Sequence, residues 1–291
     1  MTVTLGTVFL PQLPPERLRA VAQAADAAGL EQLWFWEDCF LESGIASAAA
    51  ALAWTRDLRV GIGLLPVPLR NVALTAMEIA TLARLFPGRI DAGLGHGVQD
   101  WMAQVGEGVG SPLTLLREHL AALRALLQGE RVTADGRYVR LDDVALDWPP
   151  ETVPAVLAGA VGPRTLRLTG EVADGTILTA GTSPEALAVA RRTVAEGRAA
   201  AGRGGDPPVV VYVHAATGPD GAQRLEAERR RWGYPTMDGL GVAGGAPEIA
   251  AAVRRWADAG AGTVVLQPTP DDPDPEGFVA FAAEEVQPLL R

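Results

Sequence analysis

The chain has 291 residues, of which 48% are hydrophobic and 21% charged, so it can build the core of one large α/β barrel or of two smaller domains. Its 25 basic and 35 acidic side chains give a net charge of −10 at pH 7, which argues against nucleic-acid or membrane-surface partners. A single cysteine excludes an intramolecular disulfide, and the first residues lack a signal-peptide pattern, so we expect a cytoplasmic protein.

Eight short apolar segments alternate with longer segments of helical periodicity, which predicts repeated strand–helix units. The predicted strands cover residues 2–10, 32–36, 58–65, 88–95, 153–158, 174–179, 208–216 and 262–268. The predicted helices cover residues 14–29, 71–88, 111–129, 183–202, 246–262 and 275–290. Because the strands are continuously apolar, we expect them to be buried on both faces. This pattern favours an α/β fold of the (β/α)8 TIM-barrel type with insertions, with an open doubly wound sheet as the alternative.

Two segments interrupt the alternation. Residues 130–148 contain Asp135–Gly136 between runs of alternating polarity, which predicts an inserted hairpin. Residues 219–246 mix aromatic residues with glycines after the seventh strand, which predicts a loop insertion. We find no linker or internal repeat, and therefore expect residues 1–291 to form a single domain.

Two acidic residues, Glu37 and Asp38, directly follow the second strand. In a barrel this position lies at the carboxyl ends of the strands, where catalytic groups gather. Neighbouring residues of an extended backbone point to opposite sides, so only one of the pair is expected to face the site. The alternative is a polar strand end without catalytic function.

Three glycines at alternate positions, Gly93, Gly95 and Gly97, end the fourth strand. They do not match the dinucleotide fingerprint, because Val98 stands where the last glycine would be. Either they allow a flat ligand to approach the backbone or they form a tight turn. Between them, His96 is the histidine that we select as a functional candidate.

The other two histidines give less indication of a functional role. His119 lies beside Glu118 on a predicted helix, where we expect it to be exposed, and His214 lies within an apolar strand. No pair of histidines has the spacing of metal ligands, so no metal site is predicted.

A possible anion site follows the fifth strand. Gly162–Pro163 begins a helix, and Arg164 lies in its first turn. Exposed backbone N–H groups beside an arginine favour a phosphate or carboxylate, although an ordinary Gly-Pro helix start would look the same.

Several segments together resemble one family, the luciferase-like monooxygenases, in the order in which that family carries them. These are GLEQLWFWED (29–38), the run from LRVGIGLL to DAGLGHG (58–97), SPLTLLREHL to GRYVRL (111–141), VPAVLAGAVGPR to DGTIL (153–178) and GAPEIAAAV to VVLQP (245–268). The resemblance implies a (β/α)8 barrel that binds reduced FMN or the deazaflavin coenzyme F420 at the carboxyl ends of its strands. The runs 68–89 and 93–97 are most similar to the F420-dependent branch, which transfers a hydride at ring carbon C5. The resemblance also implies a homodimer.

The resemblance extends to single positions. Glu37 falls on the family's acidic position and Asp38 on a position where relatives often have histidine. Residues 61–65 match a bulge that commonly holds a non-prolyl cis peptide. Val98 stands where some sugar-phosphate-oxidising relatives have a glutamate proton donor, which argues against that substrate chemistry.

The implied sites can be stated residue by residue. The predicted proton-transfer residues are His96, Glu37 and Asp38. The predicted cofactor-binding residues are Trp36, Gly63, Leu64, Gly95, His96, Gly97, Val98, Gly159, Gly162, Pro163 and Arg164. The leading hypothesis is an F420-dependent oxidoreductase acting on a small organic substrate, bound near residues 98–110 and 232–237. The alternatives are a monooxygenase that uses reduced FMN and a barrel that binds a flavin or deazaflavin without catalysis.

Overall fold

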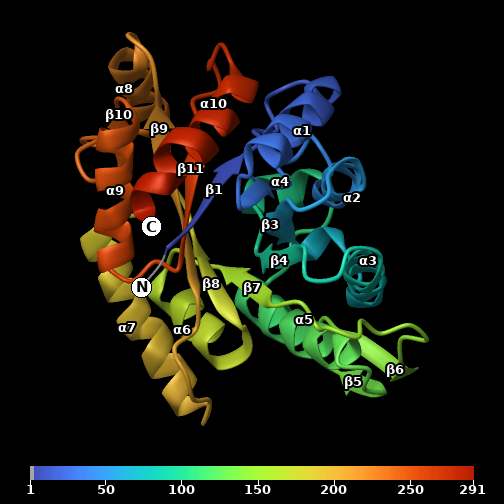
Figure 1. Cartoon of the computed structure of the whole chain (residues 1–291). Helices are drawn as coiled ribbons and strands as arrows, with labels where there is room; N and C mark the ends of the chain where they lie inside the picture. The colour runs from blue at the N-terminus through green and yellow to red at the C-terminus, as the bar shows by residue number, and fades with distance from the viewer. Residues whose placement is uncertain (1–2) are drawn as a thin grey trace.

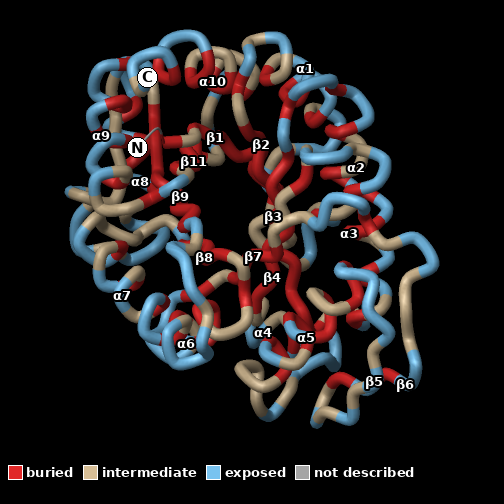
Figure 2. Tube along the Cα trace, turned by 60° about the horizontal axis from the view of Figure 1, so that its bottom comes forward, coloured by how far each residue is buried: buried red, intermediate tan, exposed pale blue. Residues whose placement is uncertain are grey.

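In the computed structural model, which describes residues 3–291, eight parallel strands close into a barrel surrounded by helices (Figures 1 and 2). The barrel strands are β1 (Thr4–Val8), β2 (Gln32–Phe35), β3 (Arg59–Pro66), β4 (Ile90–Gly95), β7 (Val156–Gly159), β8 (Gly175–Leu178), β9 (Val209–Ala216) and β11 (Thr263–Gln267). The first and last strands pair in parallel, with Thr4 opposite Thr263, which closes the barrel. The TIM-barrel prediction is therefore confirmed, and the open sheet is excluded.

The surrounding helices are α1 (Leu18–Ala28), α2 (Gly44–Trp54), α3 (Val72–Leu85), α4 (Gln99–Gln104), α5 (Pro112–Leu127), α6 (Pro163–Val172), α7 (Pro184–Ala200), α8 (Gly221–Trp232), α9 (Ala246–Asp258) and α10 (Pro275–Phe281). Shorter helical turns are η1 (Pro15–Arg17), η2 (Val67–Leu69), η3 (Ala282–Val286) and η4 (Gln287–Leu290). Side chains of Ser43, Asn71, Ser111 and Ser183 accept backbone hydrogen bonds at the starts of α2, α3, α5 and α7. None of the helices within residues 3–291 is long and apolar enough to cross a membrane.

Two insertions lie outside the barrel alternation. Strands β5 (Val132–Asp135) and β6 (Arg140–Val144) form an antiparallel pair that projects beside α5 (Figure 1). The Glu118 carboxylate on α5 accepts the backbone N–H groups of Arg137, Tyr138 and Val139 at 2.8–3.0 Å, which fastens the hairpin to the helix. Residues 219–246, predicted as a loop, contain α8 and the short strand β10 (Gly241–Ala243), which pairs with the end of β9. The single-domain organisation stays a prediction.

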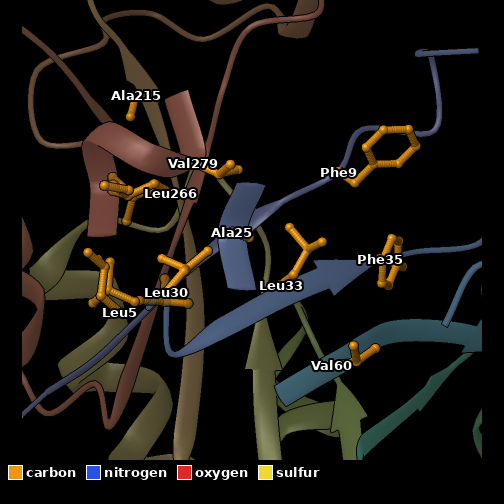
Figure 3. Packing of buried hydrophobic residues seen from close by; sticks show 14 of the residues in the cluster. Leu5, Phe9, Ala25, Leu30, Leu33, Phe35, Val60, Ala215, Leu266 and Val279 are labelled. Carbon is orange, nitrogen blue, oxygen red and sulfur yellow. The ribbon is translucent and has the colours of Figure 1, made fainter. Parts of the chain in front are cut away.

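The barrel strands alternate between two apolar environments, as the two-residue period of a strand requires. Outward-facing Leu5, Leu33, Phe35 and Val60 pack against helical residues such as Ala25 and Val279 (Figure 3). The inward-facing cluster consists of Val8, Leu10, Trp34, Leu157, Ile177, Val210, Tyr212 and Val265. This inner cluster fills the barrel below the carboxyl ends of the strands and forms the floor of the site.

Candidate active site

Two aromatic residues meet where the inner cluster reaches the carboxyl ends of the strands. The Trp36 ring, after β2, meets the Tyr212 ring of β9 edge-on, with 5.8 Å between centroids. The Tyr212 hydroxyl donates a hydrogen bond across the barrel to the Gly63 carbonyl of β3, at 3.2 Å. Burial raises the pKa of Tyr212, so this hydroxyl stays protonated and holds β9 and β3 at a fixed separation.

The end of β3 presents the side chain of Leu64 to the site. The cis peptide expected within residues 61–65 lies between Gly63 and Leu64. A Cβ on Gly95 would lie 2.5 Å from a Leu64 methyl group, and a Cβ on Gly159 would collide with the same methyl. Leu64 is half-buried, and its contact with a cofactor ring stays a prediction.

The glycines of β4 have a packing function that the sequence did not reveal. A Cβ on Gly93 would collide with Ile177 and lie 2.6 Å from the Ile62 carbonyl oxygen. Together with Gly95, it leaves room for large side chains inside the barrel. Gly97 has a φ of +67°, which favours glycine for conformational reasons. Contact of Gly95 and Gly97 with a cofactor stays a prediction.

Glu37 is held in an ion pair that is largely shielded from water. Arg70 donates to both carboxylate oxygens, and the Gly44 N–H at the start of α2 donates to Oε2 at 2.9 Å. The side chains of Glu37 and Arg70 are only 10% and 11% exposed. Because its oxygens are already engaged with a permanent cation and a helix N-terminus, the geometry argues against the proton-transfer role predicted for Glu37.

Asp38 has different surroundings. Its Oδ2 accepts a hydrogen bond from Trp36 Nε1 at 3.0 Å, so its carboxyl group lies against the aromatic floor. Burial raises the pKa of Asp38, while the Trp36 hydrogen bond and the Arg231 charge act in the opposite direction. This group retains a proton to higher pH than an ordinary aspartate, as a proton donor in a desolvated site requires. Of the two adjacent acidic residues, Asp38 is therefore the candidate for proton transfer.

His96 contacts the first turn of α6. Its Nε2 lies 3.1 Å from the Thr165 hydroxyl, and burial lowers the pKa of His96. The imidazole is therefore neutral near pH 7 and links the β4 loop to the start of α6. A direct catalytic role of His96 stays a prediction. Val98 follows in the same loop, exposed, at the residue preceding α4.

The start of α6 has the features of an anion-binding site. Gly162 precedes the helix without a side-chain cap, Pro163 occupies its first position, and Arg164 is exposed. Among residues 3–291, apart from Gly162 and its chain neighbours, no heavy atom lies within 4 Å of the position that a Cβ on Gly162 would occupy, so the approach to the backbone is open. The free N–H groups of a helix start and an adjacent guanidinium suit a phosphate group. These residues therefore fit a cofactor that carries a phosphate.

Sequence reasoning missed three contributors to this region. Tyr212 and His214 lie in β9, and the unbroken apolar run of this strand does not indicate which of its residues face the site. Arg70 pairs with Glu37 across 33 residues of sequence. An alternation within β9 that places residues 210, 212 and 214 on one face was the only available signal. The expectation that His119 is exposed is wrong, because His119 belongs to the buried residues of α5 and is only 1% exposed.

Comparison with known proteins places these features in a wider context. A family model described as Luciferase-like monooxygenase matches residues 3–272. Over 209 residues the chain is 34% identical to the 5,10-methylenetetrahydromethanopterin reductase of Methanolobus tindarius, covering 72% of this chain and 63% of that protein. It spans 60% of the same-named protein of Archaeoglobus fulgidus. It is also 30% identical over 327 residues to the F420-dependent glucose-6-phosphate dehydrogenase of Kineococcus radiotolerans, covering 96% of this chain and 94% of that protein.

Solved structures share the fold along the whole chain. The coenzyme F420 dependent tetrahydromethanopterin reductase from Methanopyrus kandleri has a TM-score of 0.85 at 22% identity, with 100% of both chains covered. An F420-dependent secondary alcohol dehydrogenase in complex with an F420-acetone adduct has a TM-score of 0.88 at 20% identity, again with 100% of both chains covered. At these identities the likeness establishes the barrel architecture alone.

Proposed function

The chain belongs to the luciferase-like monooxygenase family, and we propose that it is an oxidoreductase that transfers a hydride between the deazaflavin coenzyme F420 and a small organic molecule. The observation that carries this proposal is the likeness, along 96% of the chain, to a relative named as an F420-dependent dehydrogenase. Val98 is exposed and has no proton-transferring group, whereas some sugar-phosphate-oxidising relatives have a glutamate at this position. We therefore propose only the class of the substrate, a small organic molecule, and not a sugar phosphate. That the protein acts as a cytoplasmic homodimer is also part of the proposal.

The residues of the barrel mouth fit the cofactor in two places. The start of α6, at Gly162, Pro163 and Arg164, would hold its phosphate. The Leu64 side chain, supported by Gly95 and Gly159, would support its ring. When bound, the deazaflavin supplies a two-electron hydride donor or acceptor at ring carbon C5. His96 would act by positioning the α6 start through Thr165.

Asp38 would handle the proton that accompanies the hydride. Its carboxyl group is fixed by Trp36 Nε1, which leaves the second oxygen, Oδ1, available to a substrate. In the direction of substrate reduction, Oδ1 would deliver the proton to the substrate atom that becomes electron-rich. The hydrophobic surroundings supplied by Trp36 and Leu64 would exclude competing water.

Titration of the purified protein with oxidised F420 and, separately, with FMN tests this proposal. Quenching of cofactor fluorescence is expected to saturate at micromolar F420 and to be absent with FMN. The reverse result would instead support a monooxygenase that uses reduced FMN. If neither cofactor binds, the assignment of F420 or FMN as the cofactor is wrong.

A screen for turnover then separates an enzyme from a barrel that only binds F420. Loss of oxidised-F420 absorbance with any member of a panel of alcohols would establish hydride transfer. Tight binding without turnover in either direction would favour the non-catalytic alternative.

A further inference from the structure

His214 is a buried polar side chain without a partner. It is 0% exposed, and neither ring nitrogen makes a hydrogen bond to any atom of residues 3–291. It lies two residues after Tyr212 on β9, and Tyr212 belongs to the cluster inside the barrel. Because side chains alternate along a strand, His214 also faces inward, one step closer to the carboxyl ends of the strands. An unsatisfied imidazole costs stability, so its position calls for a functional reason.

Gln267 is the second polar residue at this level. It is the register partner of His214 in the parallel pairing of β11 with β9, just as Val265 is the partner of Tyr212. Register partners in a parallel sheet share a face, so the Gln267 amide points to the same side as the imidazole. Gln267 is 8% exposed. The two side chains form what we call the His214–Gln267 pair.

The chemistry of the pair selects for uncharged ligands. Burial, assisted by the Arg231 charge, lowers the pKa of His214 to about 4, so the ring is neutral at physiological pH. A neutral imidazole donates one hydrogen bond and accepts another, and a glutamine amide does the same. Neither group compensates a ligand charge, which would be costly to desolvate at this depth. A hydroxyl or carbonyl oxygen matches both.

The segment 233–240, which we call the cover, connects α8 to β10 and contains Tyr234, whose ring packs beside His214. The Tyr234 ring is 6.0 Å from the His214 ring between centroids, and the Tyr234 hydroxyl donates to the Ala180 carbonyl at 3.1 Å. The cover begins and nearly ends at glycines with positive φ, Gly233 and Gly239. A ligand that approaches the imidazole from the side of Tyr234 must displace that ring, which the hydrogen bond to the Ala180 carbonyl ties to the barrel.

From this arrangement we propose that the His214–Gln267 pair binds the neutral hydroxyl or carbonyl oxygen of the substrate. The inference rests on the proposed function, since it assigns the substrate half of the same barrel mouth. It places the substrate between β9 and β11 on one side and Asp38 of the β2 end on the other. At the atom that meets the pair, it favours an uncharged alcohol or ketone oxygen.

Ring-nitrogen NMR of protein labelled with 15N-histidine tests the proposal without requiring turnover. The His214 signals are identified as those lost in His214→Asn. The probes are cyclohexanol and cyclohexanone, compared with cyclohexanecarboxylate and cyclohexylammonium, which have similar size but carry a charge. We expect saturable shifts of the His214 signals with the two neutral probes and none with the two charged ones.

A substitution series supplies the second arm. Gln267→Leu is expected to weaken binding of cyclohexanol at least 10-fold, whereas Gln223→Leu, on the exposed face of α8, is expected to leave it unchanged. The proposal is overturned if the neutral probes, up to their solubility limit, do not shift the ring-nitrogen signals of His214. It is also overturned if Gln267→Leu binds cyclohexanol as tightly as the native chain. The two experiments test different statements. If F420 does not bind, the proposed function is wrong, whereas the NMR result alone decides whether the His214–Gln267 pair binds a neutral oxygen.

Discussion

At the carboxyl end of β2, the adjacent carboxylates Glu37 and Asp38 have opposite surroundings, so their substitutions should have different effects. Asp38→Asn removes the transferable proton but keeps an acceptor for Trp36 Nε1. We expect kcat to fall by about 100-fold or more, because positioned acid–base groups typically contribute that much. F420 binding should persist. Asp142→Asn, an exposed carboxylate on β6 of the hairpin outside the barrel, should leave kcat unchanged.

The pH profile gives Asp38 a second signature. Because burial raises its pKa, Asp38 remains protonated further toward neutral pH, and the rate of substrate reduction should fall as pH rises through that value. Asp38→Asn should lose this decline. A variant whose residual rate keeps the native pH dependence would show that another group supplies the proton.

Glu37→Gln tests stability instead of chemistry. It leaves the Arg70 guanidinium, only 11% exposed, with one fewer partner. Removing one member of a buried ion pair typically costs about 3 kcal/mol in the free energy of unfolding. Urea unfolding monitored by circular dichroism measures this cost. The matched control is Glu196→Gln in the exposed pair with Arg167, where about 0–1 kcal/mol is expected, and equal losses for both would contradict the assignment.

At the scale of elements, strand positions were readable because apolar runs bounded by Gly and Pro mark buried parallel strands. Helix α2 was missed because its alanine-rich sequence has no distinct polar face, and α8 because its charged sequence lies among glycines and aromatics. The contacts between site residues could not be predicted, because they form only when the barrel closes. The Glu37–Arg70 ion pair and the alignment of His214 with Gln267 both join residues that sequence spacing does not connect.

The strand β4 offers a test of the glycine packing. In Gly93→Ala, the added methyl would collide with Ile177 and approach the Ile62 carbonyl, and the backbone there cannot move without disturbing the β3–β4 pairing. We expect a loss of about 1–3 kcal/mol in the free energy of unfolding. Gly204→Ala, in a loop with no atom near the added methyl, is the control. If Gly93→Ala unfolds like the native protein, the glycine would instead have to be explained by ligand contact.

At the scale of the whole molecule, buried neutral histidines make stability depend on pH. Burial lowers the pKa of His119 to about 4, against about 6.5 for an unfolded chain. Between these values the unfolded state binds more protons than the folded state, so the free energy of unfolding falls as pH falls from about 6.5 to about 4. Glu42 acts in the opposite direction, because burial raises its pKa to about 7 and the folded state then takes up a proton on acidification. The net dependence of the native protein therefore mixes both signs.

Substitution of His119 isolates the histidine contribution. His119 lies on α5, and His119→Gln removes its titration. Urea unfolding at pH 7.5, 6 and 4.5 should show the native protein losing about 2–3 kcal/mol more than the variant on acidification, whatever their difference at pH 7.5. Glu42→Gln should change the acid dependence in the opposite sense. If the free energy of unfolding falls equally on acidification in the native protein and in His119→Gln, the prediction is contradicted. The histidine would then gain water or a hydrogen-bond partner on protonation, and the packing of α5 would not hold it neutral.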